Sequence, residues 1–351
     1  MNRSRCSLIT FVIAVFLLTG CGWNKLAGGK VAAGEASQGK VAVVGGVTYA
    51  AYADVANGGK LTVKKVAGAG WVTVGKPGFT ADPVGSNFSL AGDGSTLFAA
   101  FTTSNGVGVM KFEGGAWTSV GPASILVSGS VDLLTVVSVK SKLYLAVGTS
   151  RPHVFALNGS DWTDQVTGLP ADVSSLMFAA DSDGTLYAAF NDSAAGVLSL
   201  CKYAGTAWTQ VATSPEVIGD SWSPSLWVSG GTVFIIFGNN AHGAVVLKST
   251  GSTLESVGAL GSISNGDSIE YVTGAVSAGV PYVGFDNESR DSDPEPRAAQ
   301  VKQWNGSAWV LYAGYPDPCD IENTFLYAES PGSRLFLSYS DCDGDLTVQV
   351  H

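Results

Sequence analysis

A repeat of about 46 residues runs through the chain and limits what it can fold into. One marker of the repeat is a Trp, replaced once by Leu, that recurs at spacings of 46, 45, 46, 46 and 55 residues. These positions are Trp71, Trp117, Trp162, Trp208, Leu254 and Trp309. A second, aromatic marker keeps the same phase at Tyr49, Phe98, Tyr144, Tyr187, Phe234, Tyr282 and Phe336. Two independent markers at one period indicate seven structural units rather than chance.

The second marker lies in short apolar runs such as residues 49–52 (Tyr-Ala-Ala-Tyr) and 98–101 (Phe-Ala-Ala-Phe). Successive side chains of a strand point to opposite faces, so each run places an aromatic ring and an Ala on both faces. Such a strand is buried on both sides. Turn signals precede both markers: Asp93-Gly94, Asp183-Gly184 and Gly230-Gly231 before the aromatic runs, and Gly114-Gly115, Asn158-Gly159 and Asn305-Gly306 before the Trp positions. Each unit therefore predicts four strands joined by tight turns.

The composition supports an all-β fold with almost no helix. Hydrophobic residues make up 46% of the chain and charged residues only 14%, which is enough apolar material for a large core. The 45 Gly residues fit numerous tight turns.

Four strands at this period resemble the blades of β-propellers, whose repeats run about 40 to 50 residues in the WD and kelch types. The resemblance, of a kelch or sialidase-like type, covers essentially all of the chain behind residue 20. The WD and kelch signatures are absent, and so is the full Ser-x-Asp-x-Gly-x-Thr-Trp box of sialidase-like propellers. The resemblance implies a seven-bladed β-propeller of four-stranded antiparallel blades over residues 40–351, and no named activity.

The amino terminus has the pattern of an export signal, with an apolar stretch over residues 8–18 that is too short to span a bilayer. Residues 18–21 (Leu-Thr-Gly-Cys) resemble the lipobox of bacterial lipoprotein precursors. The resemblance implies that residues 1–20 are removed and that Cys21 carries acyl chains, palmitate among them, which anchor the protein in a membrane. Gly22 stands where, in this family, an Asp implies retention at the inner membrane, so the resemblance implies the outer membrane if the cell is Gram-negative. The alternative is an ordinary secretory signal in which Cys21 is incidental.

Removal of that signal takes away Arg3 and Arg5 and no acidic residue, which changes the net charge from −10 to −12. Nucleic acids and anionic lipid surfaces need a cationic footprint, so this charge argues against both as direct partners. The expected partners are the membrane, through the lipid alone, and an envelope protein or glycan.

The last repeat unit lacks its Trp strand. Residues from about 323 to 351 supply three strands, and residues 22–28, with Trp23 lying 48 positions before Trp71, match the missing fourth. An amino-terminal strand would then complete the seventh blade and remove exposed sheet edges. The alternative is that residues 21–39 form a flexible tether.

Acidic segments gather in the loops of the last two units. In propellers of this winding, loops between the second and third strands share one face with the connections between blades. We expect that face to bind a ligand, with candidates Asp286, Glu288, Asp291, Asp293 and Asp320. Trp222 and Trp227 lie outside the Trp phase and are candidates for exposed stacking surfaces.

Two further features accompany the acidic loops. Asp341, Asp343 and Asp345 alternate around Gly344 and offer the hard oxygen ligands that Ca²⁺ requires, although a solvated acidic turn is the alternative. Cysteines in adjacent loops of an exported protein, Cys319 and Cys342, predict a disulfide. Cys201, inside an apolar run, is expected to be a buried free thiol.

The function expected first is that of a lipid-anchored, non-enzymatic binding or scaffold protein of the bacterial cell envelope, with its ligand on the acidic loop face. The alternative is a carbohydrate-active hydrolase or lyase that uses Asp286, Asp341 or Asp343 on the same face. No residue is assigned a catalytic role: neither His153 nor His242 has metal-ligand spacing with a neighbour. The fold by itself does not choose between the two functions.

Overall fold

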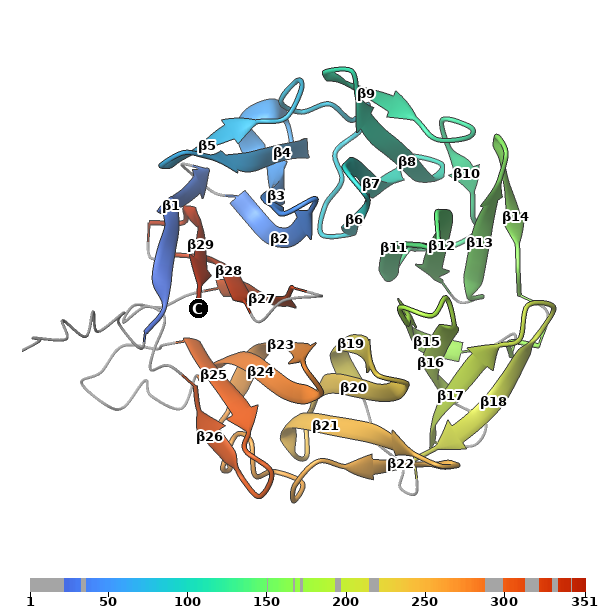
Figure 1. The fold of residues 1–351 in the computed structure, drawn as a ribbon, viewed down its shortest axis with the longest axis vertical. Helices are drawn as coiled ribbons and strands as arrows, with labels where there is room; N and C mark the ends of the chain where they lie inside the picture. Colours follow the sequence, from blue (N-terminus) through green and yellow to red (C-terminus); the bar gives the residue numbers. More distant parts are fainter. Residues whose placement is uncertain are drawn as a thin grey trace, which may run out of the picture.

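The computed structural model of the chain describes residues 22–32, 36–149, 151–166, 168–170, 173–192, 197–214, 221–287, 299–312, 322–329, 334–341 and 343–351. These residues form seven four-stranded antiparallel units arranged in a ring (Figure 1). The chain is a seven-bladed β-propeller, so the prediction from the repeat is confirmed. In this part of the chain the one helical element is the single turn η1 (Val55–Asn57), and no helix is long and apolar enough to cross a membrane.

Every blade runs from an innermost to an outermost strand. Blade 1 consists of β2 (Ala36–Val44), β3 (Val47–Asp54), β4 (Lys60–Ala67) and β5 (Gly70–Thr73). Blade 2 consists of β6 (Phe88–Asp93), β7 (Thr96–Thr103), β8 (Gly106–Glu113) and β9 (Ala116–Ser119), and a short extra strand, β10 (Ile125–Leu126), also pairs with β8. Blade 3 consists of β11 (Leu133–Val139), β12 (Lys142–Gly148), β13 (His153–Asn158) and β14 (Asp161–Asp164).

The remaining blades follow the same order. Blade 4 consists of β15 (Val173–Ala180), β16 (Leu186–Asp192), β17 (Val197–Tyr203) and β18 (Trp208–Thr213). Blade 5 consists of β19 (Ser221–Ser229), β20 (Thr232–Asn239), β21 (Gly243–Thr250) and β22 (Thr253–Ser256). Blade 6 consists of β23 (Ile269–Ser277), β24 (Val280–Asn287), β25 (Ala299–Trp304) and β26 (Trp309–Leu311). Blade 7 consists of β27 (Glu322–Ala328), β28 (Leu335–Ser340), β29 (Leu346–Val350) and β1 (Asn24–Ala32).

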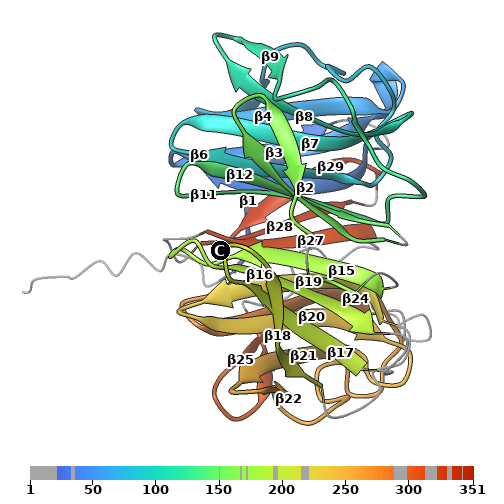
Figure 2. The ribbon, with the colours of Figure 1, turned by 90° about the vertical axis from the view of Figure 1, so that its right-hand side faces the viewer.

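The strands run across the thickness of the disc, so the connections gather on its two faces (Figure 2). The loop face carries the loops between second and third strands, such as residues 55–59 of blade 1, and the connections between blades. The turn face carries the tight turns, such as residues 45–46 and 68–69. The ring of blades is closed, because β2, the innermost strand of blade 1, packs against the innermost strands of both neighbouring blades, β6 and β27.

Blade 7 is completed by the amino-terminal strand, as predicted. β1 pairs with β29 in antiparallel fashion, from Asn24 opposite Val350 to Ala32 opposite Leu346. The strand begins and ends later than the predicted residues 22–28, and a register shift interrupts the pairing between Lys25 and Lys30. The tether alternative is therefore wrong for the described residues of this segment.

The Trp positions are structural and form a girdle around the outer strands. Five indole Nε1–H groups each donate to a backbone carbonyl of the preceding blade. The accepting residue always lies three positions after the Trp, or after its Leu replacement, of that preceding blade. The pairs are Trp71 to Leu26 (3.3 Å), Trp117 to Val74 (2.9 Å), Trp162 to Val120 (3.0 Å), Trp208 to Gln165 (2.7 Å) and Trp309 to Val257 (2.8 Å). Each bond links one blade to the next.

Two positions depart from this girdle. Leu254 has no indole to donate, and blades 4 and 5 are joined there by one parallel backbone bridge between Thr213 and Thr253, which makes them one eight-stranded sheet. Trp23 takes the marker position of blade 7, but its buried Nε1 has no hydrogen-bond partner among the described residues. Its ring packs edge-on against Tyr312 and His351 instead.

Candidate functional site

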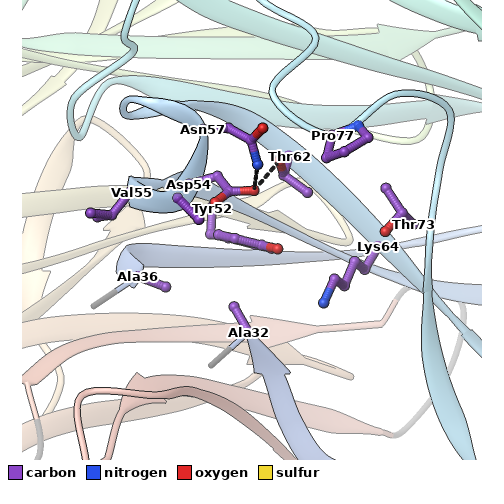
Figure 3. Close-up of a pocket in the computed structure, with 11 residues that line it drawn as sticks. Ala32, Ala36, Tyr52, Asp54, Val55, Asn57, Thr62, Lys64, Thr73 and Pro77 are labelled. Atoms are coloured by element: carbon purple, nitrogen blue, oxygen red, sulfur yellow. Dashed lines mark hydrogen bonds between the residues drawn. The ribbon is translucent and has the colours of Figure 1, made fainter. Parts of the chain in front are cut away.

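A pocket of about 490 Å³ opens on the loop face between blade 7 and blade 1 (Figure 3). Blade 7 contributes Ala32, at the end of its closing strand β1. Blade 1 contributes the ends of β2 and β3, the turn η1 and the first half of β4. The polar side chains that line the pocket are Tyr52, Asp54, Asn57, Thr62, Lys64 and Thr73.

Strand pairing explains why these side chains meet. Tyr52 and Thr62 are opposite each other on β3 and β4, and Lys64 is opposite Ala50. Directly opposed residues share a sheet face, as do residues two apart on one strand. Tyr52 and Lys64 therefore project together toward blade 7, where they meet Ala32.

The carboxylate of Asp54 is held at one oxygen and open at the other. Its Oδ2 accepts hydrogen bonds from Asn57 Nδ2 at 2.9 Å and from Thr62 Oγ1 at 2.6 Å, as the dashed lines in Figure 3 show. Within the described part of the chain, Oδ1 receives no hydrogen bond and Asp54 forms no ion pair, although the residue is only 8% exposed. One acceptor oxygen of a nearly buried carboxylate is thus left for a ligand.

The hydroxyl of Tyr52 is also unused. The residue is 4% exposed, and none of the described residues forms a hydrogen bond with its phenolic oxygen. Burial raises the pKa of Tyr52, and the nearby Asp54 carboxylate raises it further. The phenol is therefore protonated at neutral pH and can both donate and accept a hydrogen bond.

Lys64 supplies the positive charge of the pocket. Its Nζ donates to the Val31 carbonyl at 2.5 Å and lies 5.9 Å from the centroid of the Tyr52 ring. In the view of Figure 3, the Tyr52 side chain lies between the Asp54 carboxylate and Lys64 Nζ. An ammonium has three N–H donors, so two remain free for a ligand once Val31 is bound.

Blade 7 has the same two positions in a closed form. Tyr339 and Gln349 occupy the register positions of Tyr52 and Lys64. Gln349 Nε2 donates to the Tyr339 hydroxyl at 2.5 Å, and Tyr339 is fully buried. The hydroxyl that is open in blade 1 is thus satisfied within the protein in blade 7.

Blade 6 has a second closed form. Lys302 takes the position of Lys64, its Nζ donates to the Ile263 carbonyl at 2.5 Å, and it lies 5.7 Å from the centroid of Phe285. The ring is a Phe, so there is no hydroxyl to leave unpaired. In blades 2 to 5 the position equivalent to Lys64, on the third strand of each blade, holds apolar residues or a thiol: Met110, Phe155, Cys201 and Leu247. An open Tyr beside an ammonium is therefore particular to blade 1 among these seven register positions.

The three aspartates predicted to bind Ca²⁺ do come together in the turn between β28 and β29. One carboxylate oxygen from each of Asp341, Asp343 and Asp345 lies within 4.8 Å of the others. Lys30 Nζ, from the closing strand, forms ion pairs with Asp345 and with Asp343, the latter at 3.3 Å. Hydrogen bonds to these two carboxylates raise the pKa of Lys30. The turn thus carries its own counter-charge, and Ca²⁺ binding stays a prediction.

Asp341 also has a structural role. Its Oδ1 accepts from the backbone N–H groups of Asp343 (3.1 Å) and Asp345 (3.0 Å), and its Oδ2 accepts from Thr347 Oγ1 (3.0 Å). Asp54 makes the equivalent bond to Thr62 in blade 1. These carboxylates stabilise the turn between the second and third strands.

The other predicted site residues are scattered or lie outside the described residues. Asp286 lies at the end of β24 and is only 2% exposed, because this strand is sandwiched between blades. Asp286 is therefore not presented on the loop surface, contrary to the prediction. Trp227 is half-buried: it packs against core residues of blades 6 and 7 and contacts Tyr327 edge-on at 6.3 Å, so it is not the expected exposed platform. Trp222 belongs to β19, but its side chain is outside the description. Also outside are Cys21, Glu288, Asp291, Asp293, Cys319, Asp320 and Cys342, so the lipid site and the disulfide stay predictions.

Cys201 is a buried free thiol, as predicted. Burial raises the pKa of its thiol to about 11. A thiol is the weakly nucleophilic form of cysteine, so this residue offers no reactive group at neutral pH.

Sequence reasoning missed Tyr52, Asp54 and Lys64. They stand inside strands whose other residues are core residues, and they are far from the acidic loops. A signal did exist: three positions after the aromatic marker, the other units have Phe101, Val147, Phe190, Phe237, Phe285 and Tyr339. Tyr at this position combined with Lys on the next strand distinguishes the first unit.

No known protein-family model matches the chain, and no curated protein sequence is significantly similar to it. Solved structures with similar folds do exist. The β-propeller domain of Cps50 (Swd1) from Myceliophteria thermophila has a TM-score of 0.58 at 11% identity, over 91% of this chain and 98% of that one. A mutant of the Aleuria aurantia lectin in complex with Fucα1-6GlcNAc has a TM-score of 0.52 at 13% identity, over 81% of this chain and 97% of that one. A puromycin-hydrolyzing peptidase from Mycobacterium tuberculosis has a TM-score of 0.57 at 11% identity, over 93% of this chain but only 54% of the peptidase. At these identities the similarity concerns the fold: the chain is a β-propeller that resembles, in architecture, the propellers of Cps50 (Swd1), of a lectin and of a peptidase.

Proposed function

We propose that this protein is a lipid-anchored, non-enzymatic binding protein of the bacterial cell envelope, and that it takes a small polar ligand into the pocket between blades 7 and 1. The observation that carries the proposal is the pair of unused polar groups in that pocket, the Tyr52 hydroxyl and Asp54 Oδ1. Both groups line the pocket, and neither atom is among the fully buried side-chain atoms without a partner, so a ligand in the pocket can reach them. Groups left open in a pocket, while blade 7 satisfies its equivalent hydroxyl, favour a ligand there.

The same geometry favours binding over hydrolysis. Glycoside hydrolysis uses two carboxyl groups about 5 to 10 Å apart that flank the bond to be cleaved. Asp54 is the one carboxylate among the described residues that line the pocket. Asp341 is engaged by its turn and Asp286 is buried. Propellers of similar architecture include both a fucoside-bound lectin and a peptidase, so the fold itself does not decide.

The course of β1 supports an arrangement compatible with the lipid anchor. Trp23 and Asn24 follow Cys21 closely in the sequence, and Asn24 pairs with Val350 at the turn face of blade 7. Ala32, at the opposite end of β1, lines the pocket at the loop face. The two ends of β1 pair with Val350 and Leu346, which are four residues apart on β29. The two ends therefore lie about 13 Å apart along the strand direction. A lipid on Cys21 would hold the turn face toward the membrane and leave the pocket facing away from it.

Two experiments test the two halves separately. For the anchor, mass spectrometry of the protein from a bacterial membrane fraction should find acyl chains on an amino-terminal Cys21, and Cys21→Ser should release the protein from the membrane. An unmodified Cys21 in the membrane fraction contradicts the anchor and leaves the pocket untouched.

For the pocket, we would screen small polar molecules by thermal shift against the protein and a Thr73→Trp variant. Thr73 is exposed at the rim, so a Trp there should obstruct the pocket without disturbing the core. Ligands of the pocket should shift the melting temperature of the wild type and not of the variant. Hits that shift both proteins equally would place binding elsewhere and contradict this site.

A further inference from the structure

The pocket holds two opposite charges that are not paired with each other. No described residue forms an ion pair with Asp54 or with Lys64. Asp54 is nearly buried, and Lys64 is half-buried with its Nζ directed at the Val31 carbonyl. A charge taken out of water is costly unless a counter-charge and hydrogen bonds compensate it. Neither charge has a counter-charge among the described residues, and both groups line the pocket.

Four kinds of small ligand can be compared against this pocket. A cation could pair with Asp54 but would add a second positive charge beside Lys64. An anion could pair with Lys64 but would add a negative charge beside Asp54. A neutral polyol could satisfy hydrogen bonds but would bring no counter-charge to either group. A molecule with an ammonium at one end and a carboxylate at the other compensates both, through charge-assisted hydrogen bonds.

Resting on the binding function proposed above, we propose that the ligand is a small zwitterion of the free α-amino-acid type. Its ammonium group donates to Asp54 Oδ1, its carboxylate accepts from the free N–H groups of Lys64, and the Tyr52 hydroxyl donates to the same carboxylate. The cavity of about 490 Å³ has room for a molecule of this size together with water.

The other blades support the assignment because they lack this charge pair. Blade 7 has the neutral Gln349 in place of Lys64, already bonded to Tyr339. Blade 6 keeps the lysine, as Lys302, but has Phe285 in place of Tyr52. Lys302 is buried and bonded to the protein. The combination of open hydroxyl, open carboxylate oxygen and accessible ammonium is confined to the pocket of blade 1 among these three blades.

The test is isothermal titration calorimetry with free L-amino acids, each compared with two blocked forms and with a neutral sugar. The N-acetyl form removes the ammonium charge, the amide form removes the carboxylate charge, and glucose carries neither. At least one free amino acid should bind at least about tenfold more tightly than either of its blocked forms. Binding of glucose without any amino acid, or equal binding of free and blocked forms, overturns the charge argument but leaves a binding pocket. Absence of binding by every free amino acid also overturns it.

Variants tie the binding to these residues. Asp54→Asn should fold, because Asn239 fills the same strand-end position in blade 5 and accepts two backbone N–H groups there with its Oδ1. Asp54→Asn and Lys64→Met should each weaken amino-acid binding at least about tenfold. Lys302→Met, the equivalent substitution in blade 6, is the matched control and should leave binding unchanged. A loss as large in the control as in Lys64→Met would mean that general destabilisation, rather than the pocket charge, causes the effect.

Discussion

The Trp girdle makes a quantitative prediction, because one of its members lacks the hydrogen bond that the others make. Trp309 Nε1 donates to the buried Val257 carbonyl at 2.8 Å, whereas Trp23 Nε1 is buried and no residue of the described part of the chain accepts from it. Trp→Phe keeps an aromatic ring and removes the indole N–H. At Trp309 it breaks a bond and leaves a carbonyl unsatisfied, which costs about 1 to 3 kcal/mol. At Trp23 it removes a donor that is already unsatisfied, so this term is absent.

The expected result is that Trp309→Phe lowers the free energy of unfolding by about 1 to 3 kcal/mol more than Trp23→Phe does, since the loss of ring size is common to both. The assay is urea denaturation followed by far-ultraviolet circular dichroism, at a fixed pH and with m-values compared. Trp208→Phe is the matched positive control, because Trp208 donates to the Gln165 carbonyl at 2.7 Å. Equal losses at all three positions, or a larger loss at Trp23, would refute the reasoning.

Three further predictions concern ionisable groups. Burial lowers the pKa of Lys40 from 10.5 to about 8, so between about pH 8 and 10 the lysine is deprotonated in the folded state and still protonated in the unfolded state. The free energy of unfolding should therefore rise with pH over this range. Urea titrations from pH 8 to 9.5 should show this rise in the wild type and not in Lys40→Met. Lys30 forms ion pairs with Asp343 and Asp345 and so competes with Ca²⁺ for them, and Ca²⁺ should raise the melting temperature of Lys30→Met more than that of the wild type; an equal rise in both proteins would mean that the lysine does not compete. Burial raises the pKa of Cys201 to about 11, so iodoacetamide at pH 8 should label it in urea and not in the folded protein, as peptide mass spectrometry can report.

The fold was predictable because its determinants are local and periodic. An aromatic–Ala–Ala–aromatic run can be buried on both faces, and the Ala pairs are fully buried between blades, as Ala50 and Ala51 are. The recurring Trp was correctly read as structural, although its periodic hydrogen bond to the preceding blade requires three-dimensional knowledge. Even the closing strand was visible, because Trp23 keeps the phase of the repeat.

The candidate site was harder to predict because it depends on register between strands. Asp341, Asp343 and Asp345 are adjacent in sequence, so their convergence in one turn was foreseeable. The ion pairs of Asp343 and Asp345 with Lys30 were not, because Lys30 is more than 300 residues away and reaches them only through the pairing of β1 with β29. The same applies to Tyr52 and Lys64, whose meeting depends on which residue of β4 lies opposite Ala50.

The pocket lies where the ring is closed, and this position links the ligand site to the closing strand. Lys64 Nζ donates a hydrogen bond to the carbonyl of Val31 in β1. The ammonium that faces the ligand therefore also holds the closing strand β1 in place. A hydrogen bond to a charged group contributes about 1.5 to 3 kcal/mol. Lys64→Met should therefore increase the amide hydrogen exchange of residues 24–32 by about tenfold or more, since 1.4 kcal/mol corresponds to a factor of ten.

Lys302→Met is the control for that experiment, because Lys302 makes the equivalent bond to Ile263, which precedes blade 6 rather than belonging to the closing strand. It should leave the exchange of residues 24–32 unchanged and affect residues near 263 instead. If Lys64→Met left the exchange of β1 unchanged, the closing strand would be held by its pairing with β29 alone. Ligand binding and ring closure would then be independent, and the position of the pocket at the join would have no consequence for the stability of the ring.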